Sequence, residues 1–180
     1  LSHEKGFDIA LESFMELSRR WPNATLEIAG KPLPETEAFA QTALAAVPAE
    51  IKARIKLHGW LNGDALIDLY SRSDVLLFPS RTSSSGHGEG EPRVVLEAMS
   101  CGAPIVAVAG SVGHCEIISS SGVGALARHE SEFAQVVVTL MDQRERMERD
   151  REAARAFILR DYSIDAIYAQ YRSCCREALE

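Results

Sequence analysis

The chain has 180 residues, of which 46% are hydrophobic and 25% charged, and this is the composition of one globular domain with a sizeable core. A formal net charge of −7 argues against a nucleic-acid-binding surface, and no run of about 18 apolar residues is present that would span a membrane. The four cysteines form no CxxC pair, so we expect reduced thiols in a cytoplasmic protein.

The first half of the chain alternates between helical and strand patterns. Apolar residues recur at helical spacing over 6–20, and a strand pattern follows at 25–30. We expect helices over 34–46 and 49–54, a strand over 55–59 and a short helix over 64–73. The continuously apolar stretch 75–78 predicts a strand that is buried on both faces.

The second half repeats this alternation. After a loop rich in serine and glycine over 83–90, we expect a short helix that ends at Gly102, a strand over 104–108, a helix over 113–119 and a strand over 122–127. Amphipathic helices are expected over 131–142 and from Ser163, a typical N-cap, while the mixed charges over 144–155 are typical of a solvated helix face. The pattern predicts an α/β fold in one domain over 1–180, with helices on both faces of a parallel sheet.

The loop before Pro92 carries the clearest sign of function. A glycine-rich loop that leads into a helix N-terminus gathers outward-pointing N–H groups, so it is a natural anion site. Two carboxylates, Glu89 and Glu97, bracket this turn. Ligands of parallel sheets bind outside the carboxyl ends of the strands. The expected strand ends here carry small residues, at Gly30, Gly59, Ser80 and 109–110.

Residues 89–107 read Glu-Gly-x-Pro-x-Val-Val-Leu-Glu-Ala-Met-x-Cys-Gly-x-Pro-Ile-Val-Ala, which closely resembles the signature of the GT-B glycosyltransferases of family 4, also called group 1. Glu89 and Glu97 match the Glu-x7-Glu motif of that family. The segments 5–8, 26–30, 58–60 and 69–80 resemble further blocks of the family, in the family's order. The resemblance therefore covers nearly the whole chain.

The resemblance implies that the chain is the C-terminal, donor-binding half of an enzyme with two Rossmann-like domains. The absent N-terminal domain would be its partner, would supply most of the acceptor site and would be the route to any peripheral membrane association. The helix over 163–178 is a candidate contact with that domain. The implied activity is retaining transfer of a hexose from a nucleotide-diphospho-sugar, with the fragment inactive alone. No cofactor or metal is expected, because GT-B enzymes use a helix terminus and basic side chains instead of a cation.

The resemblance also implies roles for single residues. Glu97 would accept hydrogen bonds from the ribose hydroxyls, although without the resemblance an ion pair with Arg93 would be the simpler interpretation. Glu89, the catalytic candidate, would contact the sugar hydroxyls and help to place the anomeric carbon, and Lys5 would supply a cation to the diphosphate. The other candidate donor-binding residues are Gly30, Lys31, Trp60 and Leu61 at the strand ends, and Gly90, Glu91, Pro92, Arg93 and Val94 at the start of the helix.

Two departures from the family pattern keep an alternative open. The family's diphosphate-binding arginine would precede Leu1, and Glu91-Pro92 stands where the family often has Phe-Gly. Proline removes one backbone donor, and we expect Glu91 to face solvent. A non-catalytic nucleotide-binding module is the second hypothesis. A glycosidase acid/nucleophile pair is disfavoured because both carboxylates come from one short segment, and a dinucleotide oxidoreductase because no GxGxxG follows a strand.

Overall fold

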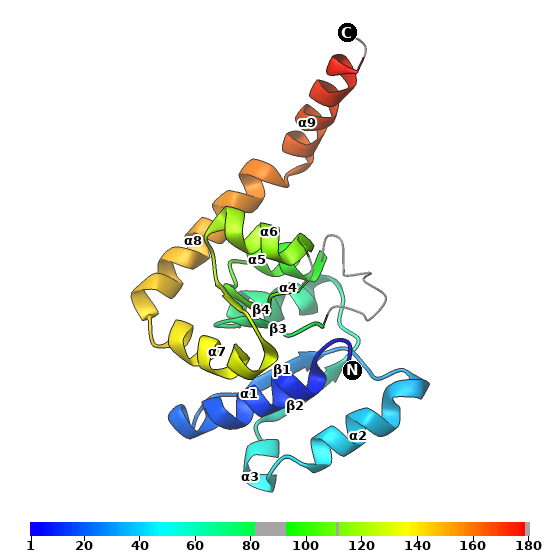
Figure 1. Cartoon of the computed structure of the whole chain (residues 1–180), viewed down its shortest axis with the longest axis vertical. Helices are drawn as coiled ribbons and strands as arrows, with labels where there is room; N and C mark the ends of the chain where they lie inside the picture. The colour runs from blue at the N-terminus through cyan, green and yellow to red at the C-terminus, as the bar shows by residue number, and fades with distance from the viewer. Residues whose placement is uncertain (82–92, 111, 179–180) are drawn as a thin grey trace.

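The computed structural model describes residues 1–81, 93–110 and 112–178, which form an α/β fold (Figure 1). The first half of the chain contains α1 (Phe7–Arg20), β1 (Leu26–Ala29), a 3-10 turn (Pro34–Thr36), α2 (Glu37–Ala45), α3 (Ala49–Lys52), β2 (Ile55–Gly59), α4 (Gly63–Arg72) and β3 (Leu76–Phe78). The second half contains α5 (Arg93–Ser100), β4 (Ile105–Val108), α6 (Val112–Ser121), β5 (Ala125–Ala127), a second 3-10 turn (Glu130–Glu132), α7 (Phe133–Met141), α8 (Arg144–Asp161) and α9 (Ile164–Glu177). The predicted alternation of helices and strands is confirmed.

The described strands form two parallel sheets, one of β1 and β2 and one in the order β3-β4-β5. Leu26 of β1 lies opposite Ile55, and Val106 of β4 lies between Leu77 and Ala125. Parallel neighbours cannot be joined by a tight turn, so helices connect them. The parallel arrangement is as predicted, but the single sheet is not, because β1 and β3 are not hydrogen-bonded to each other.

Strand β4 is the centre of the core, and all four of its residues are buried. Successive side chains of a strand point to opposite faces. Val106 and Val108 therefore pack with α1 and α7, through residues such as Phe14 and Phe133. On the other face, the neighbours of Ile105 and Ala107 come from α5, α6 and α8, and include Val95, Met99, Ile117 and Phe157. Helices thus cover both faces, as the sequence predicts.

Strand β3 differs from its prediction. Phe78 is buried, but Leu76 and Leu77 are only half-buried, whereas the apolar run predicts a strand buried on both faces. The reason is that, among the strands the structure describes, β3 is hydrogen-bonded on one side only, to β4. Its other side borders a cavity that β1 lines from across the gap.

The C-terminal helix α9 extends away from both sheets (Figure 1). It begins as predicted, with the Ser163 hydroxyl accepting a hydrogen bond from the Ala166 N–H over 3.2 Å. Its large apolar side chains are exposed, at Ile164, Ile167, Tyr168 and Tyr171. Across the described residues, no helix combines the length and apolar character that crossing a bilayer requires.

Candidate functional site

A cavity of about 580 Å³ lies between β1 and β3 and extends to the carboxyl ends of these strands. Residues near the carboxyl ends of the strands contribute to its lining. They come from separate segments of the sequence, and six of them are predicted site residues: Lys5, Gly30, Trp60, Leu61, Val94 and Glu97. The fold therefore gathers around one cavity residues that lie up to 92 positions apart in the chain, from Lys5 to Glu97.

The remaining predicted residues are placed differently. Lys31 does not line the cavity, and its side-chain stem lies over Gly59, where an added Cβ would meet Lys31 Cε at 2.9 Å. Arg93 opens α5 and is exposed, away from the cavity lining. Glu89, Gly90, Glu91 and Pro92 lie outside the described residues, so the roles expected for them stay predictions.

Glu97 lies on α5 with its carboxylate against α4. The buried side of this helix, Val95, Ala98 and Met99, packs into the core and leaves Glu97 exposed. The hydroxyl of Tyr70 on α4 donates to Glu97 Oε2 over 3.3 Å. Burial and the neighbouring Glu97 charge both raise the pKa of Tyr70 far above its ordinary value, so its proton stays in place near neutral pH. The sequence analysis places Tyr70 in the expected helix over 64–73 and in the family block 69–80 but assigns it no role at the site.

Arg81, directly beyond β3, fixes the segment that carries Lys5. Its backbone N–H donates to the Glu4 carbonyl over 2.8 Å, and its guanidinium donates to the His3 carbonyl over 2.6 Å. The same guanidinium forms paired hydrogen bonds with Asp8 and with Glu130. Burial would raise the pKa of Asp8, but the hydrogen bonds and charge of Arg81 outweigh it and lower that pKa.

Gly6 allows this segment to approach β3 closely. Its φ of +66° is left-handed, and an added Cβ would lie 2.1 Å from the Pro79 carbonyl oxygen. Only glycine fits such a contact without backbone movement. The Lys-Gly pair of the sequence thus has a physical reason: Gly6 lets α1 start against the end of β3, and Lys5 lies at the cavity as a result.

Glu27 of β1 is the centre of a charged cluster at the same cavity. Arg72 of α4 donates to both of its carboxylate oxygens over 2.6 Å, and Lys56 and His58 of β2 also contact it, at 3.3 and 2.8 Å. The hydrogen bonds from Arg72, opposed in part by burial, lower the pKa of Glu27 to about 2. The carboxylate is therefore charged at neutral pH, and the cluster links β1, β2 and α4.

His114, in the first turn of α6, is buried with 1% exposure. Its Nε2 lies 2.7 Å from the Val108 carbonyl at the end of β4, and its ring meets Phe78 edge-on at 5.3 Å between centroids. Its Nδ1 has no hydrogen-bond partner among the described residues. Burial lowers the pKa of His114, which keeps the ring neutral at physiological pH.

No group of three or more His, Cys, Asp or Glu side chains is arranged to hold a metal ion within residues 1–81, 93–110 and 112–178. The cations near the cavity are instead Lys5 and Arg72, both lining it. Their charges suit an anionic ligand, but Arg72 is already paired with Glu27.

The sequence model described as "Glycosyl transferases group 1" matches residues 1–157. The chain belongs to the group 1 glycosyltransferases. The assignment to group 1 made from the motif residues is therefore confirmed.

Individual relatives agree with this assignment. This glycosyltransferase chain is 30% identical over 127 residues to the amylovoran biosynthesis glycosyltransferase AmsK of Erwinia amylovora, in an alignment that covers 71% of this chain and 30% of AmsK. Its fold matches Alr3699/HepE of Anabaena, solved in complex with UDP, with a TM-score of 0.80 at 21% identity, over 98% of this chain and 46% of that one.

The glycosyltransferase chain also matches the solved C-terminal domain of LpcC, a group 1 family protein of Francisella tularensis. The TM-score is 0.77 at 19% identity, over 91% of this chain and 83% of that one. The chain spans less than half the length of AmsK and of HepE. Its α/β fold is thus that of GT-B C-terminal domains.

Proposed function

We propose that this domain binds the nucleotide-diphospho-sugar donor of a retaining hexosyltransferase. The observation that carries the proposal is a cavity at the strand ends, which is lined together by Lys5, Gly30, Trp60, Leu61, Val94 and Glu97. A donor of this kind presents a base, a ribose, a diphosphate and a sugar, and each of these needs a different kind of protein group. The cavity offers an aromatic surface, a carboxylate and a cation within one site.

Glu97 is the ribose-binding residue in this proposal. An ionised carboxylate accepts hydrogen bonds from two vicinal hydroxyls. The Tyr70 hydroxyl, which donates to Oε2, orients the carboxylate and leaves its other oxygen for the ligand. Trp60 is 72% exposed at the cavity and, with Leu61, offers an apolar surface to the base.

The diphosphate lies near Lys5 and the first turn of α5 in this proposal. The bond between the anomeric carbon and the diphosphate breaks with negative charge building on the leaving group, so cations and N–H groups at this point stabilise the transition state. Arg81 positions Lys5 without contacting the donor. Lys31 and Arg93 contribute charge at longer range. Glu89, together with 90–92, would face the sugar as the sequence motif predicts.

In this proposal, the binding site for the acceptor lies in another part of the protein. An N-terminal domain would close over the donor, supply the acceptor site and account for any peripheral contact with a membrane, and α9 would pack its apolar face against that domain. The 180-residue chain alone would then bind donor but transfer no sugar. No metal or cofactor is needed, because charge on the leaving group is met by protein groups. The free cysteines suit a reducing compartment, and we propose the cytoplasm.

Calorimetric titration of the folded chain with UDP, GDP and ADP tests this proposal. We expect saturable binding of one of the three, weakened in Glu97→Gln and unchanged in Glu50→Gln, an exposed carboxylate on α3. Circular dichroism establishes that each sample is folded. Absence of binding by all three nucleotides to folded protein would overturn the proposal.

A further inference from the structure

Two arginines of α8, one helical turn apart, bind the ends of two other helices. Arg151 donates from Nη2 to the Ser73 carbonyl, directly after α4, over 2.7 Å. Arg155 donates from Nη2 to the Cys101 carbonyl, directly after α5, over 2.8 Å. The last carbonyls of a helix have no partner within it and form its negative end, so a guanidinium stabilises them. The sequence predicts a solvated helix face over 144–155, and these two side chains depart from that prediction.

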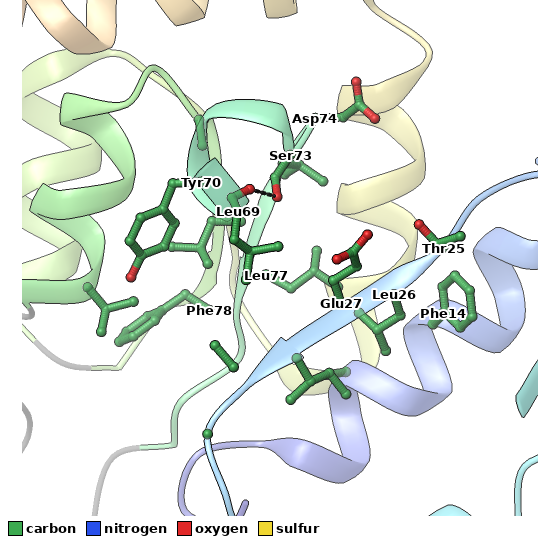
Figure 2. Close-up of a pocket in the computed structure, with 18 of the residues that line it drawn as sticks. Phe14, Thr25, Leu26, Glu27, Leu69, Tyr70, Ser73, Asp74, Leu77 and Phe78 are labelled. Carbon is green, nitrogen blue, oxygen red and sulfur yellow. Dashed lines mark hydrogen bonds between the residues drawn. The ribbon is translucent and has the colours of Figure 1, made fainter. Parts of the chain in front are cut away.

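Both of these carbonyls belong to residues that hydrogen-bond back to the Tyr70–Glu97 pair. The Ser73 N–H donates to the Tyr70 carbonyl over 3.3 Å, and the Cys101 N–H donates to the Glu97 carbonyl over 3.2 Å. Figure 2 shows Tyr70 and Ser73 at the end of α4, with a further hydrogen bond from the Ser73 hydroxyl back to the helix. A single residue thus connects each arginine to one member of the pair that contacts the cavity.

Helix α8 is held in the core and gives the two arginines a fixed support. Ala154 and Phe157 are buried in the same cluster as Val95 and Met99 of α5. Because the two arginines are four residues apart, they lie on the same side of α8 and about 6 Å apart along its axis. This separation constrains the distance between the carboxyl-terminal ends of α4 and α5.

The surroundings of both guanidinium groups hold them in place. The Arg151 side chain is only 18% exposed, and its Nη2 also lies 3.8 Å from Asp74 Oδ1. The Arg155 guanidinium lies across Gly102, where an added Cβ would be 2.7 Å from Cζ and Nη2 and 3.0 Å from Nε. Any larger residue at position 102 would therefore displace the guanidinium from the end of α5.

The contact between the Tyr70 hydroxyl and the Glu97 carboxylate is sensitive to the placement of these two helices. At 3.3 Å it is longer than the usual 2.5–3.0 Å of an O–H···O hydrogen bond. A shift of α5 away from α4 by about 0.5 Å would take the hydroxyl out of hydrogen-bonding reach. The contact therefore depends on whatever sets the distance between the helix ends.

We propose that Arg151 and Arg155 are positioning residues for the donor site, which hold the ends of α4 and α5 so that the Tyr70 hydroxyl meets the Glu97 carboxylate. Neither arginine lines the cavity, so both act only through the pair. Their effect on donor binding rests on the proposed function. Their control of the contact between Tyr70 and Glu97 does not.

Fluorine NMR on the ligand-free chain tests this control. The four tyrosines are replaced by 3-fluorotyrosine, and the Tyr70 signal is assigned from its loss in Tyr70→Phe. The change in its shift on Glu97→Gln measures the contact. We expect this change to fall to less than half in Arg151→Met/Arg155→Met. It should keep its full size in Arg149→Met, which alters an exposed arginine of the same helix.

Nucleotide titration then tests the effect on the site. With whichever of UDP, GDP and ADP binds best, we expect the double variant to weaken binding about three- to fivefold, the effect of losing about 1 kcal/mol of hydrogen bonding. The 2′,3′-dideoxy form of that nucleotide should show no loss, because it lacks the hydroxyls proposed to meet Glu97. A purely structural role of the arginines would weaken both ligands equally.

The two measurements separate this inference from the proposed function. Absence of nucleotide binding would count against the proposed function and leave the fluorine result valid. An unchanged response of the Tyr70 signal in the folded double variant would overturn the positioning role, as would equal weakening of both nucleotides. If circular dichroism shows that the double variant is unfolded, Arg155→Met alone, at an exposed position, takes its place with the same expectations.

Discussion

The hydroxyl of Tyr70 donates to Glu97 Oε2 across the contact between α4 and α5, over 3.3 Å. Tyr70 is 8% exposed, so it is held by packing, whereas the carboxylate it contacts faces solvent at the cavity. The buried Tyr70 hydroxyl thus restricts the orientation of the exposed Glu97 carboxylate. Such a restriction lowers the entropy that a carboxylate loses when it binds a ligand.

We expect Tyr70→Phe to weaken binding of the preferred nucleoside diphosphate about three- to fivefold, the effect of losing about 1 kcal/mol. The loss should shrink to nothing with the 2′,3′-dideoxy nucleotide, which lacks the hydroxyls that Glu97 is proposed to bind. Calorimetry with both ligands measures this difference. An equal loss for both ligands would show that Tyr70 acts on folding and not on the carboxylate.

Glu97→Gln should weaken the same nucleotide about ten- to hundredfold, because hydrogen bonds to a charged group contribute about 1.5–3 kcal/mol. The change keeps the shape of the side chain and leaves the buried side of α5 intact. Competitive titration gives the ratio of dissociation constants. Combined with Tyr70→Phe, the double variant should lose little more than Glu97→Gln alone, since the two residues act through one carboxylate.

Arg81→Met should lower the free energy of unfolding by about 2 kcal/mol and the Tm by about 4–8 °C. The guanidinium is only 15% exposed and binds Asp8, Glu130 and the His3 carbonyl. Its removal leaves Asp8 partly buried without its cation. Urea unfolding followed by circular dichroism measures the loss, and Arg19→Met, at an exposed position on α1, is the matched control. A loss of unfolding free energy no larger than that of Arg19→Met would contradict the role of Arg81 in holding Asp8, Glu130 and His3 together.

Acid stability should depend on Glu27. Its folded pKa of about 2 lies below the ordinary 4.5, so the unfolded chain binds the proton more readily. The stability from this group is therefore complete above about pH 4.5 and is lost as the pH falls towards 2. We expect Glu27→Gln to be less stable than the parent chain at pH 6 and to show a shallower loss below pH 4.5. Parallel curves of unfolding free energy against pH would rule this out.

Stability should also depend on pH through His114, over a range that lies above the range of Glu27. Burial lowers its folded pKa below the ordinary 6.5, so stability is complete above about pH 6.5 and falls as the pH decreases from there. His114→Met, of similar volume, should remove this part of the slope below pH 6.5. His129→Gln, at an exposed position, is the matched control. Thermal melts across this range provide the comparison.

The elements of the fold could be read from the sequence because their causes are local. The helical spacing of Phe7, Leu11 and Phe14 needs only the 3.6-residue period, and Ser163 acts as a cap on its own turn. The burial of β3 could not be read in this way. Leu76 and Leu77 are as apolar as the residues of β4, but burial depends on which strand lies beside them.

The candidate site, too, was predictable from the sequence only where its features depend on local patterns. By itself, the sequence determined the family, the alternation of strands and helices, and the motif residues, because these depend on residue types at fixed spacing. The tertiary structure alone decided that Lys5, Trp60 and Glu97 line one cavity. It also placed the Tyr70 hydroxyl against Glu97 and Arg81 against the segment that carries Lys5. It also decided that β1 and β3 line one cavity and are not hydrogen-bonded to each other. These relationships join residues distant in the chain through packing, and no local pattern encodes a contact whose partner lies elsewhere in the sequence.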